Sequence, residues 1–203
     1  MLFKKILSVA TVSSLALGCS STHAESMTGP AIPVVGKVNP EKIVKIEVEE
    51  KTWKCPTCNK NEQYVLEQLQ KKTNITDRNA LATIMGNIKQ ESNFVANVCE
   101  GGARVPYNKC YRGGYGLIQW TSTGRYNGLG KFGKRYGCDP STLECQTRYM
   151  INEPTFQRYL PEFEGNGQPV HQYMVAAYYW LGWGIKGPRQ TYAYNYTKKL
   201  VWS

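Results

Sequence analysis

The sequence predicts a mainly α-helical (α+β) domain with a small β-hairpin and a short N-terminal strand. Apolar residues recur at helical spacing in several separate segments of the 203-residue chain. Val44, Ile46 and Val48 alternate with charged residues as in a strand. A glycine-rich turn around Gly114 and six cysteines that follow Cys19 complete the pattern, so we expect one modest domain with loops closed by disulfides.

The N-terminus has the form of an export signal. Residues 1–24 begin with a basic segment, continue with the apolar run 6–17 and end in small residues, as a secretory signal peptide does. Cleavage after Ala24 would release a soluble protein. A lipoprotein-type sequence ending at Cys19 competes with it, and we favour this alternative, in which a lipid on Cys19 tethers the protein to an envelope membrane. Either way we expect export to the bacterial cell envelope or secretion.

Three further segments follow the leader. Residues 25–42 are rich in proline and predict an extended linker. Residues 43–60 hold the strand and a Cys-Pro-Thr-Cys motif as a small N-terminal extension. Residues 61–203 form the main domain, in which we expect helices over 61–72, from 76 or 77 to 92, over 123–136 and over 140–153, followed by an aromatic-rich stretch, 172–200.

Glu91 is the candidate catalytic group. Leu81, Ile84 and Ile88 form an apolar stripe on its predicted helix, and Glu91 extends that stripe by one further step. Burial on the stripe and the negative end of the helix dipole in the last turn both raise a carboxyl pKa toward the range of a general acid. The alternative is an ordinary ion pair between Glu91 and a nearby Lys or Arg.

A glycine-rich segment, Gly113–Thr121, follows Glu91 after about two dozen residues. Its glycines allow a ligand to approach the backbone, and Tyr115, Gln119 and Trp120 supply two aromatic rings and an amide. Sugars bind to such mixtures, because rings cover the apolar face of a pyranose and amides bond its polar groups. Together with Glu91 the segment predicts cleavage of a glycosidic bond, while a packed hairpin is the alternative for the turn alone.

Several short elements, in a fixed order, give the chain a family resemblance. They are Gly86-Asn87-Ile88, Glu91-Ser92, the run Gly114–Thr121, Arg125, Gln146 and Glu153. In this order they resemble the phage tail lysozyme family, within the lysozyme-like superfamily of lytic transglycosylases and goose-type lysozymes, over about residues 62–200. The Ala-Ala-Tyr sequence ending at Tyr178 resembles the same superfamily, although Tyr179 stands where those proteins usually have Asn.

The resemblance implies a lysozyme-like helical fold, peptidoglycan glycan strands as substrate, and cleavage of the MurNAc–GlcNAc β-1,4 link with Glu91 as general acid. It adds Ser92 and Tyr178 as substrate contacts to the three residues of the turn. Most glycosidases use two carboxyl groups, and Glu100 is the only other acid between Glu91 and Gln119. A single acid fits a lytic transglycosylase, whose substrate supplies its own N-acetyl and 6-hydroxyl groups, while hydrolysis stays open.

The rival hypothesis is a catalytically inactive protein that keeps the lysozyme-like fold and serves in cell-wall binding, envelope assembly or virion assembly. The missing second acid is its main support.

Six cysteines remain when Cys19 is set aside, an even number that predicts disulfides in an exported chain. The candidates are Cys55, Cys58, Cys99, Cys110, Cys138 and Cys145. Local pairs Cys99–Cys110 and Cys138–Cys145 would close short loops, among fifteen possible pairings. For Cys55 and Cys58 we expect a structural disulfide, because a second CxxC or a His pair that could complete a zinc site is missing. We expect no metal and no cofactor.

The mature chain is expected to be basic. Only two of the 25 Lys and Arg lie in the leader and all 15 acidic residues follow it, which leaves a net charge of +8. An exported basic domain suits anionic wall polymers or lipids rather than nucleic acid. His171 is the single histidine after Ala24, and no Gly-x-Ser-x-Gly sequence occurs, which argues against serine, cysteine and zinc hydrolases.

Overall fold

A computed structural model describes residues 51–111 and 113–203. The predicted signal peptide, Cys19, the linker 25–42 and the alternating segment at Val44–Val48 lie outside the described residues. The described part is mainly helical with one small antiparallel sheet, which confirms the predicted α+β class. Among its helices, none combines the length and the apolar character needed to cross a membrane.

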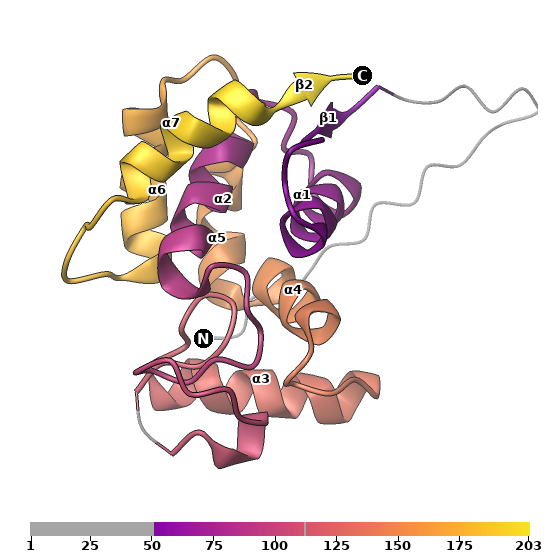
Figure 1. The fold of residues 1–203 in the computed structure, drawn as a ribbon, viewed down its shortest axis with the longest axis vertical. Coiled ribbons are helices and arrows are strands. Elements are labelled where there is room, and N and C mark those ends of the chain that lie inside the picture. Colours follow the sequence, from indigo (N-terminus) through magenta and orange to yellow (C-terminus); the bar gives the residue numbers. More distant parts are fainter. Residues whose placement is uncertain (1–50, 112) are drawn as a thin grey trace, which may run out of the picture. The chain divides into compact units, whose positions relative to one another are not determined.

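Helices account for most of the described chain (Figure 1). In order they are α1 (Lys60–Lys72), α2 (Arg78–Ser92), α3 (Thr123–Tyr136), α4 (Leu143–Asn152), α5 (Pro154–Phe163), α6 (Val170–Leu181) and α7 (Arg189–Lys199), with a short 3-10 helix at Tyr107–Lys109. The predictions for α1, α2 and α3 match within about two residues, because both their periodicity and their caps are local signals. Helix α5 is not predicted from the sequence; Pro154 occupies its first turn, where the missing N–H leaves no bond unmade.

Side-chain caps fix where the helices begin. Asn59 and Glu62 form a reciprocal capping box at the start of α1, and Asp77 accepts bonds from the first backbone N–H groups of α2. Thr142 caps α4 by accepting from the backbone N–H of Cys145, 3.3 Å away. This cap explains why α4 begins at Leu143 and not at residue 140, where the sequence prediction begins it.

Helix α2 forms the centre of the domain (Figure 1). Every residue from Ala80 to Ile88 is buried, and α2 packs against α7, α6 and α1. Gly86 makes the closest of these contacts possible, since a Cβ at this position would lie 2.4 Å from the backbone nitrogen of Ala193 on α7. The backbones of α2 and α7 therefore touch directly, and the last turn of α2 is held in a fixed position relative to α7.

The sheet joins the two ends of the described chain. Strand β1 (Trp53–Lys54) pairs antiparallel with β2 (Val201–Trp202), with Trp53 opposite Trp202 (Figure 1). The side-chain amide of Gln70 on α1 accepts from the backbone N–H of Trp53 and donates to its carbonyl. A sequence reading has no local signal for this pairing, because its partners lie at opposite ends of the domain.

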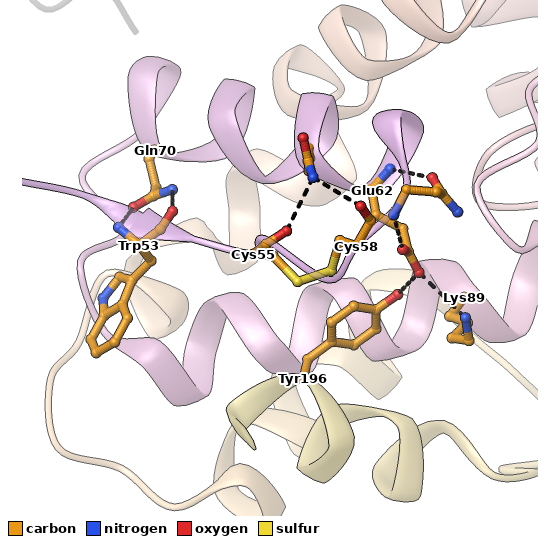
Figure 2. Close-up of a disulfide and its surroundings, with 9 residues drawn as sticks. Trp53, Cys55, Cys58, Glu62, Gln70, Lys89 and Tyr196 are labelled. Atoms are coloured by element: carbon orange, nitrogen blue, oxygen red, sulfur yellow. Dashed lines mark hydrogen bonds and ion pairs between the residues drawn. A yellow bond between two sulfur atoms is a disulfide. The ribbon is translucent and has the colours of Figure 1, made fainter. Parts of the chain in front are cut away.

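The structure joins the six cysteines in three local pairs, Cys55–Cys58, Cys99–Cys110 and Cys138–Cys145. The first links the end of β1 to the start of α1, where the side chain of Gln63 donates to the carbonyls of both Cys55 and Cys58 (Figure 2). The third links the end of α3 to the first turn of α4. These two disulfides each close a short connection between two elements, and Cys99–Cys110 closes a longer loop.

Candidate active site

Glu91 lies in the last turn of α2 and is mostly buried, with 13% of its side chain exposed. Asn93 ends the helix in the left-handed region, at φ 50°, so the chain turns away directly after Ser92. Burial raises the pKa of Glu91 by more than the positive charges of Arg189 and Arg125 lower it. The carboxyl group therefore retains its proton to higher pH than an exposed glutamate does.

The partner of Glu91 is Arg189, the first residue of α7. The Arg189 guanidinium donates to Glu91 Oε1 and to the carbonyl of Lys186, and it lies over the ring of Trp183, 4.9 Å from the ring centroid. Both members of the ion pair are largely shielded from solvent. The ion pair at Glu91, which the sequence offered as the alternative, is thus present, and the pKa of Glu91 is raised as well. The Nε of Arg189 is buried without a hydrogen-bond partner.

Ser92 connects the end of α2 to the glycine-rich segment. Its hydroxyl donates to the carbonyl of Leu117 at 2.7 Å. Within the segment, Gln119 adopts φ 52° and its side-chain amide donates to the carbonyl of Gly116 at 3.0 Å. The structure therefore brings three of the predicted site elements together: the last turn of α2, the hydroxyl of Ser92 and the turn that carries Gln119.

A buried amide holds this turn from below. Gln146 on α4 accepts from the backbone N–H of Leu117 at 2.7 Å and donates to the carbonyls of Ala96 and Pro140. Gly116 lies directly against it, at φ 75°, and a Cβ there would come within 2.4 Å of Gln146 Oε1. Only glycine satisfies both the backbone angle and the contact, so the motif glycine and the later glutamine form one structural unit.

The expectation that Tyr115 and Trp120 stack on a sugar is wrong for this structure, because both rings are fully buried. The Tyr115 hydroxyl donates to the carbonyl of Val105, and Trp120 Nε1 donates to Glu153 Oε2 at 3.2 Å. A ring without an exposed face cannot cover a pyranose. Both residues instead pack in the core beneath the turn. This is the alternative, a packed turn, that the sequence left open.

Glu153 and Arg125 form a second buried ion pair beneath the site. The Arg125 guanidinium binds both carboxylate oxygens of Glu153 and the carbonyl of Trp180. The indole N–H groups of Trp120 and Trp180 donate to the same carboxylate. With four donors from three side chains, Glu153 is fully occupied and serves as an anchor that ties the turn, α3 and α6 together.

Tyr178 lies on the exposed side of α6, with 47% of its surface accessible. Its ring meets the ring of Trp183 edge-on, at a centroid distance of 5.4 Å. Trp183 in turn lies against Arg189, the partner of Glu91. Tyr178 is therefore an accessible aromatic ring that three successive contacts, through Trp183 and Arg189, connect to the candidate acid.

A comparison with protein-family models matches residues 60–200 to the family described as phage tail lysozyme. The chain belongs to the phage tail lysozyme family. A search of curated proteins and a search of solved structures found no match. Family membership makes the chain a lysozyme-like domain that acts on peptidoglycan.

Two other acids of this phage tail lysozyme domain, Glu100 and Glu62, have structural partners. Glu100 is exposed and accepts from the backbone N–H of Gly114 at 3.0 Å, which gives it a role in shaping the loop. Glu62 on α1 is buried, but Tyr196, the backbone of Asn59 and Lys89 all bond to it (Figure 2).

The pKa values of Glu62 on α1 and Glu91 on α2 are shifted in opposite directions. Burial pushes the pKa of Glu62 upward, yet the bonds from Tyr196, Asn59 and Lys89 together outweigh it and lower the pKa. Glu62 is therefore an ionised structural group. At Glu91 the effect of burial prevails, so of these two only Glu91 has the property expected of a proton donor.

Arg189 and Trp183 are site residues that the sequence analysis does not single out. Arg189 lies 98 positions after Glu91, and its only local signal is a position one residue after Pro188, at the start of a helix. Contact between them depends on the packing of α2 against α7, which Gly86 permits. Gly86 is a glycine in the middle of a helix, which can mark close packing of two helices. This signal could have indicated that α2 contacts the helix that carries Arg189.

Proposed function

We propose that this chain cleaves the β-1,4 bond between N-acetylmuramic acid and N-acetylglucosamine in peptidoglycan, with Glu91 as the general acid. The observation that most supports this is the mostly buried Glu91 carboxyl at the end of α2, whose pKa is raised by burial, beside the glycine-rich turn. A protonated carboxyl in such a position can donate to a leaving glycosidic oxygen.

In the proposed mechanism Arg189 is a positioning residue for Glu91. Before the reaction it orients the carboxyl group through its bond to Oε1. When Glu91 gives its proton to the leaving oxygen, the resulting carboxylate lies next to a guanidinium that is already in place. Ser92, Gln119 and Tyr178 are proposed as contacts to the glycan. Ser92 follows Glu91 and bonds to the turn that carries Gln119, and Tyr178 is accessible beside Trp183.

A single protein carboxyl group matches chemistry in which the substrate assists its own cleavage. Most glycosidases place a second carboxyl about 5–10 Å from the first, but Glu100 is committed to the backbone of Gly114 and Glu62 is saturated with bonds. In a lytic transglycosylase reaction the N-acetyl and 6-hydroxyl groups of the muramic residue take that role and leave an anhydro end. Hydrolysis by an external water would leave a reducing end.

Mass spectrometry of purified peptidoglycan after digestion tests the function and its product. We expect soluble muropeptides, with anhydro ends if the substrate assists and reducing ends if water attacks. Absence of any soluble product, with the protein retained on the wall material, would contradict cleavage. It would favour the second candidate, an inactive wall-binding or assembly protein, to which the bond that already occupies Glu91 Oε1 lends support.

We further propose that the domain works outside the cytoplasmic membrane, tethered through a lipid on Cys19 or released by cleavage after Ala24. The three disulfides of the domain fit an oxidising compartment. Mass spectrometry of the mature N-terminus distinguishes a diacylated cysteine at position 19 from a free N-terminus at Glu25. An uncleaved chain that begins at Met1 would contradict both forms.

A further inference from the structure

The exposed face of α6 carries an apolar stripe that the core does not explain. Val175, Tyr178 and Tyr179 follow one another at helical spacing, with 55%, 47% and 58% of their surfaces accessible. Helices of single domains usually present polar groups to water, and grouped exposed apolar side chains mark an interaction surface. On this helix the buried face is formed by other residues, among them Tyr173, Ala177 and Trp180.

Aromatic rings connect this stripe to Arg189, the partner of the candidate acid. Trp183 lies under the Arg189 guanidinium, Tyr178 meets Trp183 at a centroid distance of 5.4 Å, and Tyr179 meets Tyr178 at 5.3 Å. Tyr159 on α5 then stacks with Tyr179 at 5.9 Å, their planes inclined by 21°. We call these four rings, Trp183, Tyr178, Tyr179 and Tyr159, the aromatic row.

The far end of the aromatic row opens into a pocket between α5 and α6. The pocket has a volume of about 430 Å³, within the range of small-molecule sites. Tyr159, Tyr179 and Val175 give it apolar walls, while Gln168, Gln172 and Glu162 give it amide and carboxylate groups. Rings beside amides suit the alternating apolar faces and polar edges of a sugar, whereas a face for protein docking is more uniformly apolar at its centre.

We propose that the aromatic row and the pocket between α5 and α6 form an extended binding surface for the peptidoglycan glycan strand, which leads away from the Glu91 site. The inference rests on the proposed function, since the strand is the ligand that also occupies the Glu91 site. Its physical basis is continuity, because each ring contacts the next from Arg189 to the pocket. In this proposal one long polymer contacts the acid and the pocket together.

Binding of a β-1,4-linked N-acetylglucosamine hexasaccharide, measured by calorimetry, tests the surface. All variants carry Glu91→Gln so that no substrate is consumed. Tyr179→Ala and Tyr159→Ala should each weaken binding about 3- to 10-fold, the size of one lost aromatic contact. Tyr179→Phe keeps the ring and should keep the affinity. Tyr194→Ala is the matched control, since Tyr194 is 43% exposed but lies on α7 outside the aromatic row.

Equal affinity of Tyr179→Ala and Tyr194→Ala, with matching thermal unfolding curves, would overturn the proposed surface. So would light scattering that reveals a dimer dissociated by Tyr179→Ala, because the face would then be an interface between two copies of the chain. The two proposals fail separately. Absence of muropeptide release from wild-type protein refutes cleavage, while normal release with hexasaccharide binding independent of Tyr179 and Tyr159 refutes only the binding surface.

Discussion

At the scale of single residues, burial and charge compete at Glu91. Burial raises its pKa, and Arg189 and Arg125 oppose that shift. The folded protein consequently holds the Glu91 proton more tightly than the unfolded chain, whose glutamate has an ordinary pKa of 4.5. The contribution of this group to stability is therefore greatest at low pH and decreases as the pH rises from that ordinary value through the raised pKa.

Replacing Arg189 with methionine tests this balance. Loss of the guanidinium removes a charge that lowers the pKa of Glu91, so the alkaline limb of kcat/KM should move to higher pH. Above that limb the ionised, mostly buried Glu91 has lost its partner, which should destabilise the fold by about 3–5 kcal/mol. A pH–rate profile on solubilised glycan measures the first effect, with exposed Arg104→Met as the control. An unshifted limb in Arg189→Met would contradict the coupling.

The sequence indicates which residues are candidates for the site, but it does not show how buried they are or what they contact. Glu91 is predictable because it continues the apolar stripe of its own helix, and Gln119 because it lies in a glycine-rich turn. Trp120 is misassigned because its burial depends on Glu153, a residue 33 positions away on the chain that accepts its N–H bond. Arg189 is missed for the same reason, since its contact with Glu91 arises only in the folded domain.

At the scale of elements, the contact of α2 with α7 places the acid and its arginine together. Glu91 lies in the last turn of α2 and Arg189 in the first turn of α7, so their separation depends on how closely the two helices approach. Gly86 sets that approach through its contact with Ala193. Helices α1 to α3 are predictable from local periodicity and caps, but this pairing and the β1–β2 sheet are long-range contacts without a local signal.

A methyl group at position 86 should force α2 and α7 apart. Gly86→Ala places a Cβ 2.4 Å from the Ala193 nitrogen, and overpacking of this kind costs about 1–3 kcal/mol. We expect lower thermal stability and reduced turnover, since the Glu91–Arg189 contact would lengthen. Gly124→Ala on α3 is the matched control, because its Cβ would meet nothing within 4 Å and alanine favours a helix. If the two variants unfold at the same temperature, the contact at Gly86 does not set the distance between α2 and α7.

In the described domain as a whole, six cysteines form short cross-links, and the helices enclose one large hydrophobic core with a small second cluster between α6 and α7. Cys99–Cys110 closes the loop that precedes the glycine-rich turn, and the backbone of Cys99 pairs with Tyr115 inside that turn. The spacing of the cysteines in the sequence suggests these pairs, but only the fold excludes the other connectivities.

Removing Cys99–Cys110 by a double change to serine should lower stability by about 3 kcal/mol, from the entropy of a loop of this length. For a domain of this size that corresponds to a fall of about 6–12 °C in Tm. Calorimetric unfolding measures it. We also expect no reactive thiol among the six domain cysteines of the untreated protein. An unchanged Tm in the double variant would show that this cross-link does not stabilise the site loop.

A comparison of Glu91→Gln with Glu67→Gln in the release of soluble muropeptides from purified peptidoglycan tests Glu91 as the proton donor. Glu67 is an exposed glutamate on α1, paired with Lys71, and serves as the control. Because glutamine cannot donate the proton, we expect release to fall about 10²- to 10⁴-fold in Glu91→Gln and to stay at the wild-type rate in Glu67→Gln. Wild-type release from a correctly folded Glu91→Gln protein would contradict the assignment of Glu91 as the proton donor.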